Sequence, residues 1–567
     1  MEQQVSSTWY VPFFQSAVCS LGPCAQIVSA IEIAGNPTSD RVLHTQATEY
    51  CNQLRAEQSA WEPCLSIFTK TPRYPDIVRI FALEIVNSAI HRGAIDGPAL
   101  RRCKDELMNH LGRIYFSDKP LPLETIATQN KVGQTLTCLF SALYGNGWET
   151  FFDDMLSFTG ATIAGGRDNV SGTIFYLQTI LFVHEDIGDQ LIPRSRAEQD
   201  HANILKDKIR ERDVQKIANS WQEILQRWRT NNQTVVELCL KVVSRWVSWV
   251  NVGLVVNQPM LGLLFDELAR IQTLDLTNAE GSTSNAAVVV LCEITGKKMQ
   301  PSEKLEIISF LNLESVVSQL IASPPLNERR NSFKYDTDLA ETVARLVNIT
   351  LLDVIKILET ETSKSSIWQR AERFLYAFLP HVLRFFADEY DEVCSTVIPA
   401  LSEFLGFLRR TSQDVVPTSE REVVLIPVLK AIFAKMRYDD SSPWGGEQDE
   451  TDEAEFQELR LRLRVLQEII AAVDEQLYVD AVTNLIKDIF DNGAVQGTNL
   501  GWRDLDLALS EMMCLGGLAV KSGGLYQKKR ATSKAAHKIK QLMQKMVEIG
   551  IASCFPSNFS LKTNLMT

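Results

Sequence analysis

Apolar residues recur at three- and four-residue steps along most of the chain, from about Asp40 to about Met546. A clear example runs from Phe456 to Val473, with charged residues on the remaining positions. This period is typical of an α-helix that buries one face. Short breaks such as KTPRYPD, SDKPLPLE and NQPM separate the patterns, and strand alternation is absent over useful lengths. The sequence therefore predicts a succession of helices.

A long series of antiparallel helix pairs without strands is what a HEAT-type α-solenoid requires, because each pair buries its apolar stripe only against its neighbours. We therefore predict an all-α, HEAT-type α-solenoid. One helical pattern, from Val393 to Leu408, contains Pro399. Proline should kink that helix or mark its first turn, since it has no backbone N–H.

Two amphipathic patterns stand close together in DHANILKDKIRERDVQKIANSWQEILQRW and SRWVSWVNVGLVVN. Four basic residues interrupt the first apolar stripe: Lys206, Lys208, Arg210 and Arg212. The stripe itself is predicted to face a helix–helix core, and it consists of Ile204, Leu205, Ile209, Ile217, Trp221, Leu225 and Trp228. Together with Trp246 and Trp249, the tryptophans favour an inter-helix core over a base-stacking platform.

Length and charge limit the classes of protein. The chain has 567 residues, 45% of them hydrophobic, which exceeds the size of one compact core and favours several domains or an elongated repeat array. Its net charge is -13. A nucleic acid could therefore bind only at a locally basic surface.

Individual residues bear on the compartment of the protein and on catalysis. Eleven scattered cysteines, without a second CxxC-like pair, indicate buried free thiols in a reducing compartment. No signal peptide or long apolar run is legible, so we expect a soluble intracellular protein without membrane insertion. GATIAGGR carries Arg167 where a phosphate-binding loop needs Lys-Ser/Thr, and we expect a mobile loop there. The seven histidines show no HExxH spacing, and we expect no enzyme activity, cofactor or metal.

Two segments carry charge of one sign. Nine carboxylates and no base lie between Arg437 and Arg460. Either a solvated insertion leading into a helix or a clamp on a basic partner would explain them. Between Glu511 and Glu548 there are eight basic residues and no carboxylate, which suits a solvated helix face and a phosphate-binding surface equally well.

Several long motifs resemble exportin-T, the tRNA export receptor of the importin-β (karyopherin) superfamily. Besides the two segments quoted above, AGNPTSDRVLHTQATEYCNQLRAEQSAWEPC and YPDIVRIFALEIVNSAI look like its first helix pairs. ADEYDEVCSTVIPALSEFLGFLR and MRYDDSSPWGGEQDETDEAEFQELRLRLRVLQEII look like the central repeats and acidic loop of fungal members. No exact repeat period is legible, so the solenoid prediction rests partly on this resemblance.

The resemblance implies a division of the chain. Residues 1–33 would be an N-terminal extension, 34–118 Ran-binding repeats like the N-terminal part of importin-β, and 119–270 repeats like those of exportin-1 and importin-β. Residues 271–553 would be further HEAT-type repeats with an acidic loop at 439–455, and 554–567 a tail outside the family.

The resemblance also implies a function: a nuclear export receptor that binds mature tRNA cooperatively with Ran-GTP and shuttles between nucleus and cytoplasm through the FG-repeat proteins of nuclear pores. It would be a monomer before complex formation. For Ran we expect contacts at an exposed edge of the N-terminal helices and at the acidic loop, namely at Arg79, Phe81, Glu84, Asp449, Glu450, Asp452, Glu453 and Glu455. For tRNA phosphates we expect Lys206, Lys208, Arg210, Arg212, Lys528, Lys529, Arg530, Lys534 and Lys538.

One departure from the family concerns length, since its members are roughly twice as long. The last residues, CFPSNFSLKTNLMT, show neither helix periodicity nor a solenoid cap, and we expect a C-terminal truncation. A karyopherin that carries protein cargo and a truncated helical scaffold that does not transport remain alternatives.

Overall fold

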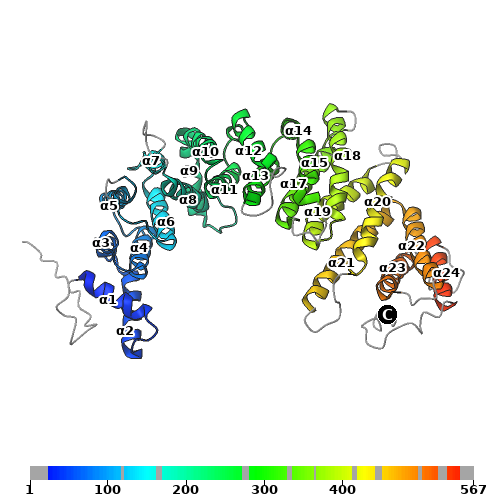
Figure 1. Ribbon diagram of the computed structural model, residues 1–567, viewed down its shortest axis with the longest axis horizontal. Helices are drawn as coiled ribbons and strands as arrows, with labels where there is room; N and C mark the ends of the chain where they lie inside the picture. The colour runs from blue at the N-terminus through cyan, green and yellow to red at the C-terminus, as the bar shows by residue number, and fades with distance from the viewer. Residues whose placement is uncertain are drawn as a thin grey trace, which may run out of the picture. The chain divides into compact units, whose positions relative to one another are not determined.

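The computed structural model describes ten stretches of the chain. They are residues 23–116, 120–160, 169–270, 280–327, 335–362, 365–411, 418–440, 450–495, 501–521 and 533–548. Within them all regular structure is helical (Figure 1). Residues 161–167 of the GATIAGGR segment lie outside the described residues. The helices cluster into two compact units, residues 1–267 and 268–567.

The first unit contains eleven α-helices, a short 3-10 helix and most of a twelfth α-helix within the described residues. They are α1 (Pro23–Gly35), α2 (Arg41–Ala56), α3 (Trp61–Thr69), α4 (Asp76–His91), α5 (Gly97–Tyr115), α6 (Ile126–Leu143), α7 (Phe151–Ser157), α8 (Val170–Ile187), α9 (Arg196–Arg212), α10 (Val214–Trp228), α11 (Gln233–Val247), η1 (Val252–Leu254) and α12 (Gln258–Arg270).

Packing in this unit follows chain order. Helix α4 packs on α6, α6 on α8 and α8 on α11. Beside this row, α3 packs on α4, α5 on α6 and α10 on α11. The result is a row of helix pairs in which each pair meets its neighbours, as Figure 1 shows for α3 to α11.

The second unit continues with twelve helices in the described residues. They are α13 (Glu280–Gly296), α14 (Pro301–Phe310), α15 (Leu313–Ala322), α16 (Pro324–Asn327), α17 (Thr337–Thr360), α18 (Ser366–Phe386), α19 (Asp391–Arg410), α20 (Thr418–Met436), α21 (Glu450–Val473), α22 (Glu475–Val495), α23 (Trp502–Lys521) and α24 (Lys534–Glu548). Here α13 packs on α17, α17 on α19 and α19 on α21. The predicted all-α HEAT-type array is confirmed.

Pro399 lies inside α19 and does not end it. Because proline has no N–H, the Ser395 carbonyl one turn earlier loses its helical donor. Arg462 of α21 donates its Nη2 to that carbonyl at 3.2 Å. Nearby, the Ala400 N–H donates to Oδ1 of Asn348 at 2.9 Å. Arg462 of α21 therefore supplies the donor that the proline lacks.

The predicted tryptophan core is confirmed for three of the four residues. Trp221, Trp228 and Trp246 are buried, and the rings of Trp221 and Trp246 meet edge to face at 6.0 Å. Trp249 is half-buried, and its Nε1 donates to Nδ1 of His184 at 3.2 Å. Ile204 is 54% exposed, so its assignment to the apolar stripe is wrong. Its neighbour Leu205 faces the core instead.

The cysteines in the described parts of the chain are free, as predicted. Six are buried, and Cys24, Cys138 and Cys514 are half-buried. Among the helices described, none alone combines the length and apolarity needed to cross a bilayer, although the bent pair α14 and α15 meets those two criteria jointly.

Candidate protein and nucleic-acid interfaces

Helix α9 carries the four basic residues that the sequence singles out. Its start is fixed by a capping box, in which the Ser195 hydroxyl accepts from the Glu198 N–H and the Glu198 carboxylate accepts from the Ser195 N–H. Leu205 and Ile209 bury the opposite face. The basic side chains are thereby held on the accessible part of the helix.

Lys208 and Arg212 point to the turn that follows α6. A Cβ atom on Gly145, whose φ is +82°, would lie 2.7 Å from the Lys208 Nζ. Arg212 donates its Nη2 to the Glu149 carbonyl at 3.2 Å and covers the Tyr144 ring at 5.6 Å. Arg212 therefore ties α9 to the turn after α6, and Lys208 lies against the same turn.

Arg210 points the other way, to the end of α11. Its Nη2 donates to the Trp249 carbonyl at 2.9 Å, and its Nη1 donates to Asp207 at 2.7 Å. Lys206, one turn earlier, is half-buried, and burial together with the charges of Arg194 and Arg210 lowers its pKa. The structure thus splits the four residues into two pairs with different neighbours.

Sequence reasoning missed two basic residues of α11, Lys241 and Arg245. Both are exposed and one helical turn apart. Both lie near the C-terminal end of α8, since their charges act on the Glu185 carboxylate. Burial, together with the charges of Arg245 of α11 and Lys206 of α9, lowers the pKa of His184 on the same helix to about 4. We call Lys206, Arg210, Lys241 and Arg245 the basic ridge. The helical spacing of Lys241 and Arg245 can be read from the sequence, but the proximity of these two residues to α9 cannot.

The second predicted basic group is less available. Lys528, Lys529 and Arg530 lie outside the described residues. Lys534 forms an ion pair with Asp480 of α22 at 2.7 Å, whereas Lys538 is half-buried. The charge of Lys534 is therefore already compensated, which weakens its case as a phosphate contact.

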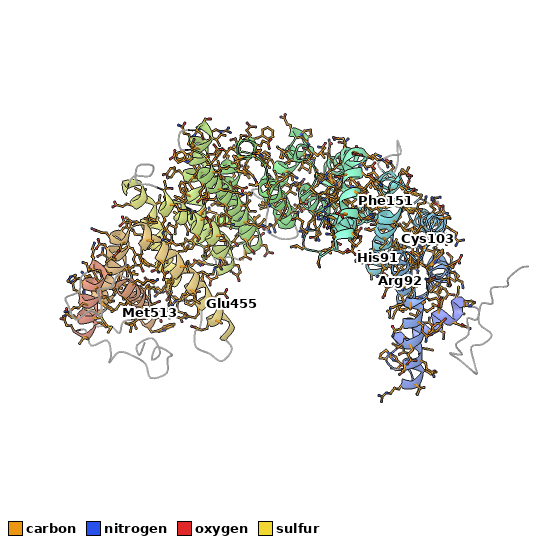
Figure 2. The ribbon with its side chains drawn as sticks, turned by 180° about the vertical axis from the view of Figure 1, so that it is seen from behind. His91, Arg92, Cys103, Phe151, Glu455 and Met513 are labelled. Atoms are coloured by element: carbon orange, nitrogen blue, oxygen red, sulfur yellow. The ribbon has the colours of Figure 1, made fainter. Side chains whose placement is uncertain are left out.

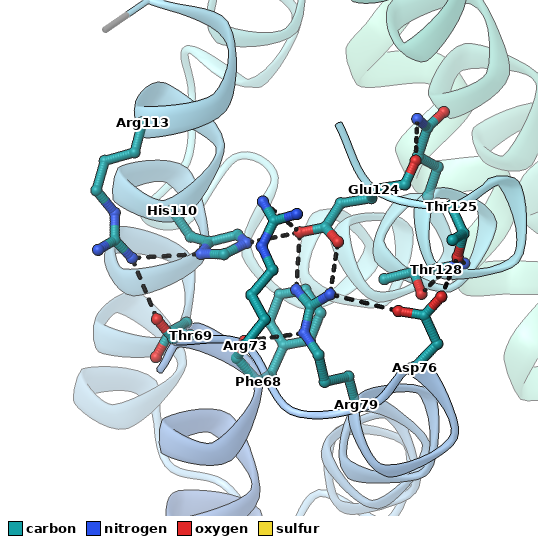
Figure 3. Close-up of polar contacts among 11 residues, drawn as sticks. Phe68, Thr69, Arg73, Asp76, Arg79, His110, Arg113, Glu124, Thr125 and Thr128 are labelled. Carbon is teal, nitrogen blue, oxygen red and sulfur yellow. Dashed lines mark hydrogen bonds and ion pairs between the residues drawn. The ribbon is translucent and has the colours of Figure 1, made fainter. Parts of the chain in front are cut away.

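Arg79 is buried, with 1% of its surface exposed, so its expected place on an exposed helix edge is wrong. Its Nη1 and Nη2 donate to the two carboxylate oxygens of Glu124 at 2.5 and 2.7 Å (Figure 3). His110 Nε2 lies 2.9 Å from Glu124 Oε1, and Arg73 forms an ion pair with the same carboxylate at 3.2 Å. Arg79 also stacks on Phe68 at 4.5 Å.

Opposing effects set the pKa of Glu124 in this cluster. Burial alone would raise the pKa of Glu124, but hydrogen bonds from Arg79 and His110 and the charges of Arg79 and Arg73 outweigh it and lower the pKa to about 2. Burial lowers the pKa of His110. The cluster joins α4 and α5 to the segment before α6, and we assign Arg79 a structural role.

Phe81 and Glu84 do lie at a partly exposed edge. Arg55 of α2 covers the Phe81 ring at 5.0 Å, and its Nε lies 3.3 Å from Glu84 Oε1. Both groups of this ion pair are 42% exposed, so solvent competes with it. This edge of α2 and α4 remains available for a partner.

An acidic groove of about 910 Å³ lies in the second unit. Glu455, near the start of α21, is exposed (Figure 2). Glu453 accepts a hydrogen bond from the Tyr438 hydroxyl at 2.7 Å. Asp449 is outside the described residues, and for Glu450 and Asp452 the backbone alone is described. The charged residues that line the groove are Asp388, Glu389, Asp391, Glu392, Asp439, Asp440, Glu455, Glu458, Lys435, Arg437 and Arg462.

In the described residues, no three His, Cys, Asp or Glu side chains are grouped as a metal site would need. The arrangement instead offers two kinds of surface. The basic ridge suits an anionic partner and the acidic groove suits a cationic one.

Comparison with known proteins gives two family matches. The pattern of the family described as Exportin-T matches residues 365–561, and that of Exportin 1-like protein matches residues 127–291. A solved structure of an engineered protein aligns with 78% of this chain and 98% of its own at 11% identity, with a TM-score of 0.30.

Individual relatives extend these matches. Proteins named Exportin-T from Aspergillus niger and Aspergillus terreus are 53% and 54% identical over 530 residues, which is 93% of this chain and 51% and 52% of those proteins. The chain spans about half the length of the curated relatives it matches. The resemblance to exportin-T predicted from the sequence is confirmed.

Proposed function

We propose, from this similarity to exportin-T proteins, that the chain acts in a nuclear export receptor that binds mature tRNA together with Ran-GTP. The observation that carries the proposal is the identity of 53% over 93% of the chain. The protein would be a carrier and not an enzyme. It would enter the complex as a monomer and shuttle between nucleus and cytoplasm through FG-repeat proteins of the pore.

Cooperation between the two ligands has a physical basis in linkage. If tRNA and Ran-GTP both favour one conformation of a repeat array, each raises the affinity for the other by the same factor. A flexible array suits this coupling because its repeats contact mainly their neighbours.

For tRNA we propose the basic ridge as a contact, since its exposed lysine and arginine side chains can reach phosphate oxygens. Lys241 and Arg245 are the strongest candidates because both side chains are exposed. Such contacts read backbone shape without base identity. Neutralising the exposed charges should therefore weaken binding to all tRNAs alike.

For Ran we propose the edge formed by Phe81 and Glu84, with Arg79 supporting it from inside. The acidic groove around Glu455 would add a contact to a basic surface of the GTPase. Opposite potentials on the two partners favour association and fix its register.

The test is fluorescence anisotropy of labelled tRNA, titrated with the protein at two salt concentrations, with and without Ran locked in its GTP form. We expect a salt-sensitive complex that Ran-GTP tightens. Binding of Ran-GTP without tRNA would favour a carrier of protein cargo. If neither ligand binds, the export function is refuted and a helical scaffold remains.

A further inference from the structure

Three cysteines from three different helices gather at the N-terminal end of the first unit. Cys24 lies in the first turn of α1, Cys51 in α2 and Cys64 in α3. Helix α1 packs on both α2 and α3 (Figure 1). The fold thereby brings together thiols that are well separated in the sequence.

The closest approach joins α1 to α3. The thiol of Cys24 donates to the carbonyl oxygen of Pro63, which precedes Cys64, with its Sγ at 3.9 Å. A carbonyl oxygen lies about 2.8 Å from the next Cα atom, so Cys24 Sγ is within about 6.7 Å of the Cys64 Cα. Disulfide-bonded cysteines have Cα atoms about 4.4–6.8 Å apart. Bonding therefore requires side-chain rotation and a small shift at the start of α1, and the helices keep their arrangement.

The three thiols differ in their access to solvent. Cys24 is half-buried, whereas Cys51 is 4% and Cys64 0% exposed. Burial, and then the neighbouring Cys24 and Cys51, raise the pKa of Cys64 to about 12. Such a thiol is a poor first target for an oxidant, because the thiolate is the reactive form. Of the three, Cys24 is the thiol that an oxidant can reach.

We propose that Cys24 and Cys64 form a reversible disulfide when the chain meets hydrogen peroxide. The structure shows the reduced state, in which both thiols are free. In a reducing compartment a disulfide of this kind is transient and reports oxidation. The inference stands apart from the proposed function, because it requires neither tRNA nor Ran.

The chemistry proceeds in two steps. The sulfur of Cys24 attacks one oxygen of the peroxide, the O–O bond breaks, and the leaving hydroxide takes the thiol proton to form water, which leaves a sulfenic acid. The sulfur of Cys64 then attacks the sulfur of Cys24, the S–S bond forms and the S–O bond breaks. The second hydroxide leaves with the Cys64 proton as water. Two thiols thus lose two electrons, and one peroxide molecule is reduced to two water molecules.

The bond would lock the first helix pairs of the unit. Helix α1 packs on α2, α3 and α4. A disulfide that closes a loop of about 40 residues restricts the opened segment more than the folded one. The oxidised chain should therefore open α1 less often than the reduced chain.

The test treats the reduced full chain with hydrogen peroxide, alkylates the remaining thiols and maps the peptides by mass spectrometry without reduction. We expect a linked pair of peptides that contains Cys24 and Cys64, and glutathione should separate this pair again. Amide hydrogens of α1 should exchange about tenfold more slowly in the oxidised chain than in the reduced chain.

Matched variants assign the bond. Cys64→Ser should abolish both the link and the slower exchange, and dimedone should then trap the sulfenic acid at Cys24. Cys51→Ser removes a buried thiol of the same cluster and should preserve both effects. The Tm of the reduced variants shows whether they fold. If Cys64→Ser does not fold, Cys24→Ser at its half-buried position provides the same test.

Absence of the link in the oxidised wild-type chain would overturn the inference, and so would a bond from Cys51 to either of the other two cysteines in its place. Slower exchange of α1 that persists in Cys64→Ser would also contradict it. These results leave the proposed function untouched, since that is measured with tRNA and Ran under reducing conditions.

Discussion

Glu124→Gln should destabilise the N-terminal helix pairs by about 3 kcal/mol. The substitution keeps the shape of the side chain but removes the buried carboxylate that pairs with both terminal nitrogens of Arg79, which is 1% exposed. Arg79 then keeps only the longer ion pair with the partly exposed Asp76, at 3.7 Å. Removing one partner of a buried ion pair costs about 3–5 kcal/mol.

An independent argument gives a similar magnitude. The pKa of Glu124 falls from 4.5 to about 2 in the folded chain. Each pKa unit corresponds to about 1.4 kcal/mol, so the carboxylate contributes roughly 3 kcal/mol at neutral pH. Since the folded pKa is depressed, this contribution is present above about pH 4.5 and is lost as the pH falls towards 2.

The assay is amide hydrogen exchange of α4 and α5 in the full chain, because a repeat array need not unfold in one step. A loss of about 3 kcal/mol should speed exchange there by roughly a hundredfold. The control is Glu84→Gln, whose ion pair is 42% exposed on both sides and should contribute less than about 1 kcal/mol.

Equal exchange in the Glu124 and Glu84 variants at neutral pH would refute the reasoning. So would a difference that persists unchanged at about pH 2, where the carboxyl of Glu124 becomes protonated.

Three other outcomes are expected. Glu511 is fully buried, and burial raises its pKa from 4.5 to about 7. The unfolded chain therefore releases this proton at lower pH than the folded chain, and the stability of the wild-type chain should fall as the pH rises from about 4.5 to 7. Glu511→Gln should abolish that fall and raise the Tm at pH 8. Leu205→Ala should cost about 2–5 kcal/mol in denaturant unfolding, whereas Ile204→Ala should cost less than about 1, because the first side chain is buried and the second is exposed. Replacing Lys241 and Arg245 by Gln should weaken tRNA binding and reduce its salt slope by about 1–2, as read by anisotropy at several salt concentrations; an unchanged slope would contradict the basic ridge.

The helical class and much of the helix placement could be read from periodicity. The pattern from Phe456 to Val473 lies within α21 and ends at the last residue of that helix. The pattern from Val393 to Leu408 lies within α19. A period of 3.6 residues depends on local geometry and on which face is apolar, and both are properties of the chain itself.

Site residues were predicted less completely. The basic residues of α9 were found because charge is visible in the sequence, but their division between two neighbouring helix pairs was not. Lys241 and Arg245 were missed because two exposed basic residues one turn apart do not by themselves indicate a binding surface. They do so only when the fold places another basic helix beside them.

The sequence by itself determined that the chain is a helical repeat array resembling exportin-T, because the apolar period and the long motifs can be read along the chain without knowing which residues are in contact. Only the tertiary structure decided that Arg79 is buried, because its partner Glu124 lies 45 residues further along the chain. Whether a charged side chain faces water or core depends on whether folding brings an opposite charge to it. That information resides in the packing of helices and is invisible to the spacing of residues along any one of them.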